Sequence, residues 1–187
     1  AAFNLCAPCS HAAVTPVETE ILKADVAAGR LLPVAKRIPN PPLVTGFDGT
    51  SFTRGTHGGT LHMLIARAQD VRMLFVYGYA RLVHYDRNLA LVPDILERID
   101  VQGERVFTLR LRKGHRWSDG QPFTAEDFRY FWEDVANNKE LSPTGPPSEL
   151  IVDGKLPEFK VLDSTTVRYS WASPNPEFLA RLAGASP

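Results

Sequence analysis

The clearest alternation of apolar and polar residues lies in the middle of the chain. The apolar side chains of Phe107, Leu109 and Leu111 stand two residues apart, with polar residues between them. This period of two is typical of a strand that buries one face and exposes the other to water. The sequence therefore predicts a strand over 105–111, with one face in the core and one basic, solvated face.

A turn is predicted directly after this strand. Residues 113–121 include Gly114, Ser118, Asp119 and Gly120. Glycine accepts a positive φ at little cost, and short polar side chains bond to their own backbone. We therefore expect the chain to reverse here.

A helix is expected to begin near Ala125. Thr124 can accept a hydrogen bond from the amide three residues on, and Asp127 can reach back, which is the arrangement of a capping box. Apolar residues then follow at i, i+3, i+4 and i+7 of a helix, namely Phe128, Phe131, Trp132 and Val135. We expect this face to lie in the core and not against solvent.

The rest of the chain predicts mixed α and β structure in which antiparallel hairpins dominate. Upstream, the expected elements are a helix at 18–28 ended by Gly29, a proline-rich extended segment at 33–59, a core strand at 60–66, a short helix within 67–77, and hairpins of 81–85 with 89–92 and of 95–101 with 105–111. Downstream, they are a loop at 137–147, a pairing of 150–155 with 159–162 across Gly154, a strand at 167–171, and a helix capped by Asn175 with Pro176 at its first position.

Composition excludes several classes of protein. The 187 residues are 44% hydrophobic and 22% charged, which is ordinary for a globular domain. No apolar run is long enough to span a membrane. Equal numbers of acidic and basic residues, 21 each, argue against a nucleic-acid binder. A local basic cluster is explained by a solvated strand edge, and it consists of Arg110, Arg112, Lys113 and Arg116.

Both cysteines lie near the start of the chain, as Cys6-Ala7-Pro8-Cys9. We interpret residues 1–13 as the end of an export signal peptide or as a disordered tail. A redox dithiol and lipid attachment are the alternatives. A zinc site lacks a second cysteine pair, and His11 stands one position too late for covalent haem.

No catalytic group is indicated. The five histidines are scattered and never share one helical face at i and i+4, and they are His11, His57, His62, His84 and His115. Motifs of serine hydrolases, zinc proteases and phosphate-binding loops are absent from the sequence. We therefore expect a protein that is not an enzyme and has no metal or cofactor.

Five segments resemble, in order, the motifs of the family 5 extracellular solute-binding proteins. The longest is WSDGQPFTAEDF at 117–128, with LRKG before it. The others are GGTL at 58–61, YARLVHYD at 79–86, LVPDILE at 91–97 and TTVRY at 165–169. The resemblance covers roughly 58–187.

Members of that family have two lobes that close on a ligand. The resemblance implies that residues 59–187 form part of lobe I of a periplasmic-binding-protein-like fold, preceded by a helix and an extended lead-in over 14–58. The chain begins with Ala1 and ends without an evident closing element. We expect it to be a fragment in which the second lobe is absent.

The resemblance also assigns site residues. In peptide-binding members, the loop after the first strand faces the cleft, which makes Arg67, Ala68, Gln69 and Asp70 candidate ligand contacts. Tyr77 and Tyr79 are candidate aromatic walls of the cleft. The turn of Trp117, Asp119 and Gly120 and the cap of Thr124 and Asp127 are expected to be structural.

The function implied by the resemblance is that of an exported receptor, periplasmic or extracellular and monomeric. It would capture a peptide or other small solute and deliver it to an ABC permease and ATPase complex in the membrane. One alternative is an oligosaccharide receptor, although Trp132 and Trp171 lie on faces expected to be buried and not on an open sugar platform. A redox or hydrolytic protein using Cys6 and Cys9 is the other.

Overall fold

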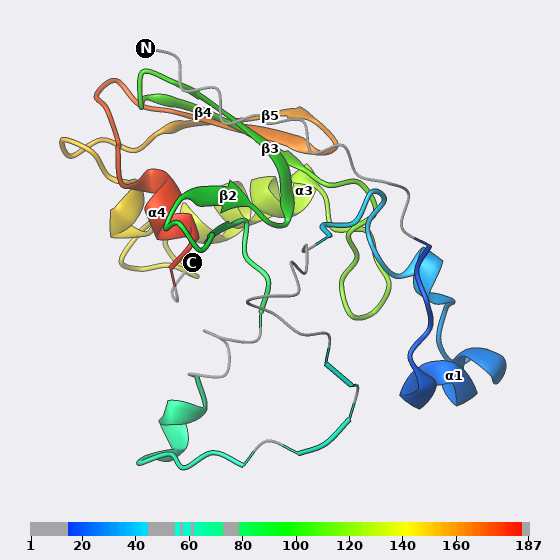
Figure 1. The fold of residues 1–187 in the computed structure, drawn as a ribbon. Coiled ribbons are helices and arrows are strands. Elements are labelled where there is room, and N and C mark those ends of the chain that lie inside the picture. Colours follow the sequence, from blue (N-terminus) through cyan, green and yellow to red (C-terminus); the bar gives the residue numbers. More distant parts are fainter. Residues whose placement is uncertain (1–14, 45–54, 57, 61, 73–78, 185–187) are drawn as a thin grey trace.

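The computed structural model describes residues 15–44, 55–56, 58–60, 62–72 and 79–184 (Figure 1). Its centre is a four-stranded antiparallel sheet in the order β3-β4-β6-β5. The strands are β3 (Leu96–Gln102), β4 (Val106–Leu111), β5 (Glu158–Asp163) and β6 (Thr166–Ser170). A separate hairpin pairs β1 (Val83–Tyr85) with β2 (Leu91–Pro93). The mixed α and β class and both upstream hairpins are thereby confirmed.

Short helices accompany the sheet. They are α1 (Glu20–Ala27), η1 (Val34–Lys36), η2 (Ala68–Arg72), α3 (Ala125–Arg129), the π-helical η3 (Tyr130–Ala136), η4 (Ser148–Leu150) and α4 (Phe178–Leu182). Figure 1 shows α3 and α4 on the same side of the sheet. The helix expected near the N-terminus is present as α1, and Gly29 follows it with a φ of 70°.

The core lies between the sheet and these two helices. Phe107, Leu109 and Leu111 of β4 are 2%, 0% and 1% exposed, so the predicted buried face is confirmed. The ring of Phe107 lies 4.9 Å from that of Phe178 in α4 and 5.8 Å from that of Trp171. Because aromatic pairs at these separations add to the energy of burial, this cluster holds α4 to the sheet.

The hairpin turns follow the sequence signals closely. In the first, one carboxylate oxygen of Asp86 accepts hydrogen bonds from the amides of Asn88 and Ala90, both at 2.8 Å. In the second, Gly103 and Glu104 both have positive φ, at 57° and 53°. Two successive positive φ values match the right-handed twist of the paired strands and fix their register.

The strand expected at 60–66 is wrong for the part that the structure describes. Residues 62–66 are irregular, and their backbone groups make no hydrogen bond to another described residue. Leu64 is fully exposed, and Met63 and Ile65 are about half exposed. A strand is stable only beside a partner, and the described chain presents none here.

Two downstream expectations are also corrected. The segment after Gly154 pairs with β6 and not with 150–155, which closes only as a bridge between Val152 and Lys155. The pairing with β6 places Phe159 beside Tyr169, with ring centroids 5.0 Å apart. A pairing of 159–162 with 150–155 would not form this contact. Helix α4 begins after Glu177, and the buried Asn175 does not cap it with its side chain.

The backbone amide of Asn175 instead donates to the carbonyl of Glu104 at 2.7 Å, which links this residue to the β3–β4 turn.

Arg112 also differs from the prediction, which placed it on a solvated face. It is only 7% exposed, and its Nε donates to the carbonyl of Asp94 at 2.9 Å. Strand β4 ends at Leu111, so the alternation no longer governs the next residue.

The apolar helix face is only partly in the core. Phe128, Trp132 and Val135 are half-buried, but Phe131 is 45% exposed. The chain turns π-helical from Tyr130, and the amide of Asn137 donates to the carbonyl of Trp132, five residues back, at 3.3 Å. A wider turn moves side chains off the stripe that a 3.6-residue period predicts.

Candidate ligand-binding cavity

An apolar cavity of about 440 Å³ lies between the sheet, α3 and α4. Its walls come from four parts of the chain that are distant in sequence. Its apolar lining consists of Leu82, Phe123, Phe128, Phe131, Pro147, Leu150, Phe178 and Leu182. Its polar lining consists of Trp117, Asp127, Glu149, Tyr169 and Arg181. A cavity of this size and character is typical of small-molecule sites.

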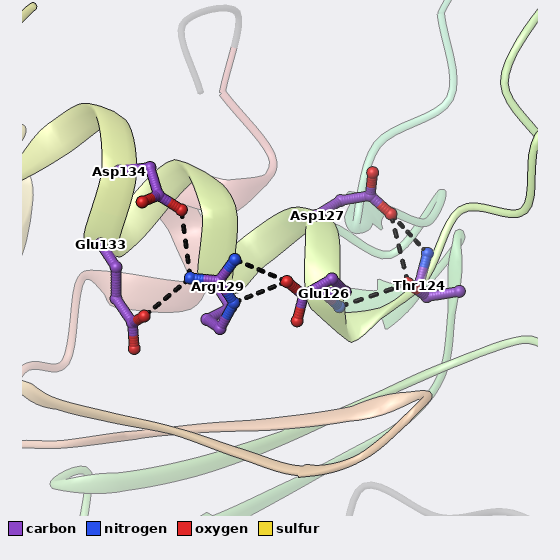
Figure 2. Close-up of polar contacts among 6 residues, drawn as sticks. All are labelled: Thr124, Glu126, Asp127, Arg129, Glu133 and Asp134. Atoms are coloured by element: carbon purple, nitrogen blue, oxygen red, sulfur yellow. Dashed lines mark hydrogen bonds and ion pairs between the residues drawn. The ribbon is translucent and has the colours of Figure 1, made fainter.

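The capping box at the start of α3 positions one wall. The amide of Thr124 donates to Asp127 Oδ2 at 2.7 Å, and the amide of Glu126 donates to Thr124 Oγ1 at 3.3 Å (Figure 2). The capping box expected from the sequence is therefore present. It fixes the direction in which α3 leaves the turn, and so it places Asp127 and Phe128 on the cavity.

The remaining acidic residues of this helix gather around one arginine. Figure 2 shows Arg129 between Glu126 on one side and Glu133 and Asp134 on the other. The three contacts measure 2.6, 2.8 and 3.1 Å. The hydrogen bond from Arg129 lowers the pKa of Glu126, and the same network raises the pKa of Arg129. None of these four side chains lines the cavity.

The Trp117 turn forms the edge of the cavity. The amide of Gln121 donates to Asp119 Oδ1 at 2.8 Å, and the Gly120 amide donates to the carbonyl of Trp117 at 2.9 Å, with a φ of 89° at the glycine. The indole Nε1 of Trp117 donates to Asp127 Oδ1 at 2.9 Å. Its ring packs edge-on against Phe123, at 5.0 Å between centroids.

Trp117 is also 50% exposed. Half of its surface is therefore open to solvent at the edge of the cavity.

Tyr169 lines the inner side of the cavity. It is 8% exposed, and burial raises the pKa of its hydroxyl. The phenol therefore stays neutral at physiological pH, and its hydroxyl can both donate and accept a hydrogen bond.

The predicted ligand-contact loop lies away from this cavity. Arg67, Ala68 and Gln69 are exposed and Asp70 is half-buried, and none of them lines the cavity. The amide of Arg67 donates to Asp70 Oδ2 at 2.9 Å, which closes the loop at the start of η2. Tyr79 is 65% exposed, and it does not line the cavity either.

Tyr77 lies outside the described residues, as do Cys6, Cys9 and the whole segment 1–13. Ligand contact by 67–70 and Tyr79 therefore remains a prediction. Among the described residues, no group of three or more histidine, cysteine, aspartate or glutamate side chains is arranged to hold a metal ion. Helices in the described ranges are also too short or too polar to cross a membrane.

Sequence reasoning missed the cavity as a site. Leu150, Phe178 and Leu182 carry no motif, and they meet Phe128 only because the sheet and α4 bring distant segments together. The aromatic residues around 117–131 were the one signal that pointed to this region.

The chain is similar to known binding proteins over much of its length. It is 27% identical to the periplasmic alpha-galactoside-binding protein of Rhizobium meliloti, over 78% of this chain and 24% of the relative. It is 31% identical to the periplasmic oligopeptide-binding protein OppA of Escherichia coli, over 50% of this chain and 20% of the relative. The chain thus spans only about a fifth to a quarter of the curated relatives that it matches.

The fold comparison agrees with the sequence comparison. A solved structure of an oligopeptide-binding protein OppA overlaps 91% of this chain and 26% of its own, with a TM-score of 0.76 and 28% identity. A family model described as "Bacterial extracellular solute-binding proteins, family 5 Middle" matches residues 90–187, which is more than half of the sequence. This chain therefore belongs to the family 5 bacterial extracellular solute-binding proteins.

Proposed function

We propose that the protein is the receptor component of an ABC importer that captures a peptide-like solute outside the cytoplasm. The main support is the overlap of 91% of this chain with an oligopeptide-binding protein, at a TM-score of 0.76. The receptor would bind its solute between two lobes, and lobe closure would present the loaded form to a permease and its ATPase in the membrane. Each lobe would supply part of the binding energy.

Export to the periplasm or cell surface belongs to the same proposal. The family is described as extracellular, and both relatives named above are periplasmic. The protein would act there as a monomer, with residues 1–13 as the end of the export signal.

The loop at 67–70 is the proposed peptide contact. Its side chains are largely exposed, and the hydrogen bond between Arg67 and Asp70 keeps the loop closed upon itself. Recognition through backbone groups would accept many side chains in the ligand, as suits a receptor for peptides of varied sequence. Tyr79 would contribute an aromatic surface.

An oligosaccharide is the second candidate solute. The alpha-galactoside-binding relative matches a larger share of this chain than OppA of E. coli does, 78% against 50%. Against it, Trp171 is 6% exposed and Trp132 is half-buried against Phe159, so neither ring offers an open platform for a sugar.

The test is uptake by the source organism. Deleting the gene is expected to abolish most uptake of radiolabelled trialanine and to leave uptake of raffinose, an alpha-galactoside, unchanged. Loss of raffinose uptake alone would favour the sugar receptor. If the uptake of both solutes is unchanged, the receptor function is wrong.

Complementation tests the loop. A gene carrying Arg67→Ala, Gln69→Ala and Asp70→Ala is expected to restore normal protein levels but not trialanine uptake, because the Asp70 carboxylate that accepts from the Arg67 amide holds the loop backbone in place. The matched control replaces Lys139 and Glu140, which are exposed in another loop, with alanine. It should restore both the protein level and trialanine uptake. Restoration of uptake by the triple variant would remove the loop from the site.

A further inference from the structure

The cavity beside α3 and α4 is a hollow that is open to solvent and has mainly apolar walls. A volume of about 440 Å³ would accept a molecule with a fused-ring or branched apolar body. The loop assigned to the peptide lies elsewhere, so the cavity has no role in the proposed function.

The charges around the cavity favour a cation. Asp127 and Glu149 are acidic, and Arg181 is the one basic residue of the lining. Arg181 already pairs with Glu177 at 2.9 Å, so its charge is offset. An anionic ligand would therefore meet two carboxylates and no uncompensated positive charge.

Glu149 is the carboxylate open to a ligand. Both oxygens of Asp127 are engaged, one by the Trp117 indole and one by the Thr124 amide. Glu149 is exposed, and it accepts a long hydrogen bond of 3.3 Å from the hydroxyl of its neighbour Ser148. No basic group of the described residues lies within ion-pair distance of it.

Two aromatic rings add to the preference of the cavity for a cation. Phe131 is 45% exposed and Trp117 is 50% exposed, and both line the cavity. Exposed aromatic faces attract cations through their ring quadrupole. The π-helical turn exposes Phe131, and the ring of this residue thereby forms part of the cavity wall.

We propose that this cavity binds a primary amine with an apolar, ring-containing body. The body would lie against Phe128, Phe131 and Leu182, and the ammonium group would lie near Glu149. Shape and burial provide most of the affinity, and the carboxylate selects the amine over neutral and anionic molecules of the same size.

The experiment is calorimetry on the 187-residue chain with three probes of matched size. They are 2-(1-naphthyl)ethylamine, 2-(1-naphthyl)ethanol and 1-naphthylacetate. The amine is expected to bind about threefold more tightly than the alcohol, which is the size of an exposed ion pair. The acid should bind most weakly. Equal affinities, a tighter acid or no saturable binding at all would overturn the proposal.

Variants separate the two parts of the site. Glu149→Gln should remove the preference for the amine and leave alcohol binding intact, whereas Phe131→Ala should weaken all three probes. Glu140→Gln is the matched control, since this exposed carboxylate is not part of the lining. An amine preference that survives Glu149→Gln would overturn the assignment of that residue.

Salt gives a second readout that needs no variant. The preference for the amine should shrink at 0.5 M sodium chloride, because surface charges are screened there, while the affinity for the alcohol should stay unchanged.

Finally, a longer form of the protein that binds no amine would identify the cavity as a docking face for its own chain. That result would also overturn the proposal, and it leaves the receptor function untouched.

Discussion

At the scale of single residues, Asp127 connects three features of the molecule. One oxygen accepts from the Trp117 indole, the other accepts from the Thr124 amide, and the residue lines the cavity. The turn, the helix start and the cavity wall are therefore held by one carboxylate. These contacts support the prediction that Trp117 has a structural role, and that role can be separated by experiment from a role in ligand binding.

Trp117→Ala is expected to lower the free energy of unfolding by about 1–2 kcal/mol, because it removes a hydrogen bond and an aromatic contact. The loss is smaller than for a fully buried ring, since half of this ring is already exposed. Urea denaturation measures it. Ser118→Ala in the same turn is the control and should lie within about 0.5 kcal/mol of the parent. A Trp117→Ala variant with unchanged stability but weaker ligand binding would contradict the structural role.

At the scale of elements, the sheet carries the fold. Leu109 in β4 is 0% exposed, and it lies opposite Val167 of β6, which is 1% exposed. The alternation in the sequence is clear because strands flank β4 on both sides, while the helices cover the face that carries Leu109.

Leu109→Ala should therefore cost about 2–5 kcal/mol of stability, from lost burial and the cavity left behind. Leu162→Ala is the matched control in the edge strand β5, where the side chain is 42% exposed. Its cost should stay below about 1 kcal/mol. Thermal and urea unfolding followed by circular dichroism compare the two variants. Equal losses would mean that the strands contribute alike and that β4 is not the centre of the core.

The N-terminal segment is held by its own contacts. Arg37 forms an ion pair with Glu18, and the amide of Val34 donates to the same carboxylate at 3.0 Å. Further on, the amide of Asn40 donates to the carbonyl of Lys113 at 2.9 Å, which attaches the segment to the loop after β4.

This segment should loosen in acid. The hydrogen bond from Arg37 lowers the pKa of Glu18, so its stabilising contribution is complete above the pKa of the unfolded chain and is lost as the pH falls through the lower folded value. The protection factor of the Val34 amide, which is its exchange rate corrected for the intrinsic effect of pH, should thus fall in that acid range. Glu18→Gln should exchange rapidly already at neutral pH, whereas Glu20→Gln, on the exposed side of α1, should behave like the parent. A protection factor at Val34 that stays constant across this pH range in the parent would contradict the role of this carboxylate.

At the scale of the whole molecule, the proposed receptor needs contacts from two sides of its ligand. This chain overlaps 26% of the oligopeptide-binding structure that it resembles. The exposed apolar segment at 62–66 is a surface of the kind that a second lobe would cover.

The 187 residues alone should therefore bind trialanine very weakly, with a dissociation constant of about a millimolar or above. The reason is that one lobe provides only part of the contacts and cannot close. Calorimetry with trialanine measures this, and the protein should be the same preparation that is tested with the naphthyl probes. Micromolar binding would show that the chain holds a complete peptide site and would refute the two-lobe requirement for it.

The local pattern of residues correctly predicted those features that depend on contacts between residues close together in the sequence. The two upstream hairpins, the buried face of β4, the turn at 113–121 and the capping box of α3 all rest on contacts within a few residues. The backbone preferences of Gly103 or Gly120 and the reach of Asp127 to Thr124 are properties of the local chain. These features therefore follow directly from the amino-acid sequence.

Only the tertiary structure decided the features that depend on distant partners. It paired Phe159 with Tyr169, buried Arg112 against the Asp94 carbonyl, moved Phe131 into a half-exposed position and left 62–66 without a strand partner among the described residues. The cavity itself arises because α3, β6 and α4 meet in space. The sequence by itself thus determined the upstream hairpins, the start of α3 and the family motifs, whereas packing between remote segments determined the cavity, since burial and strand pairing are properties of the whole fold.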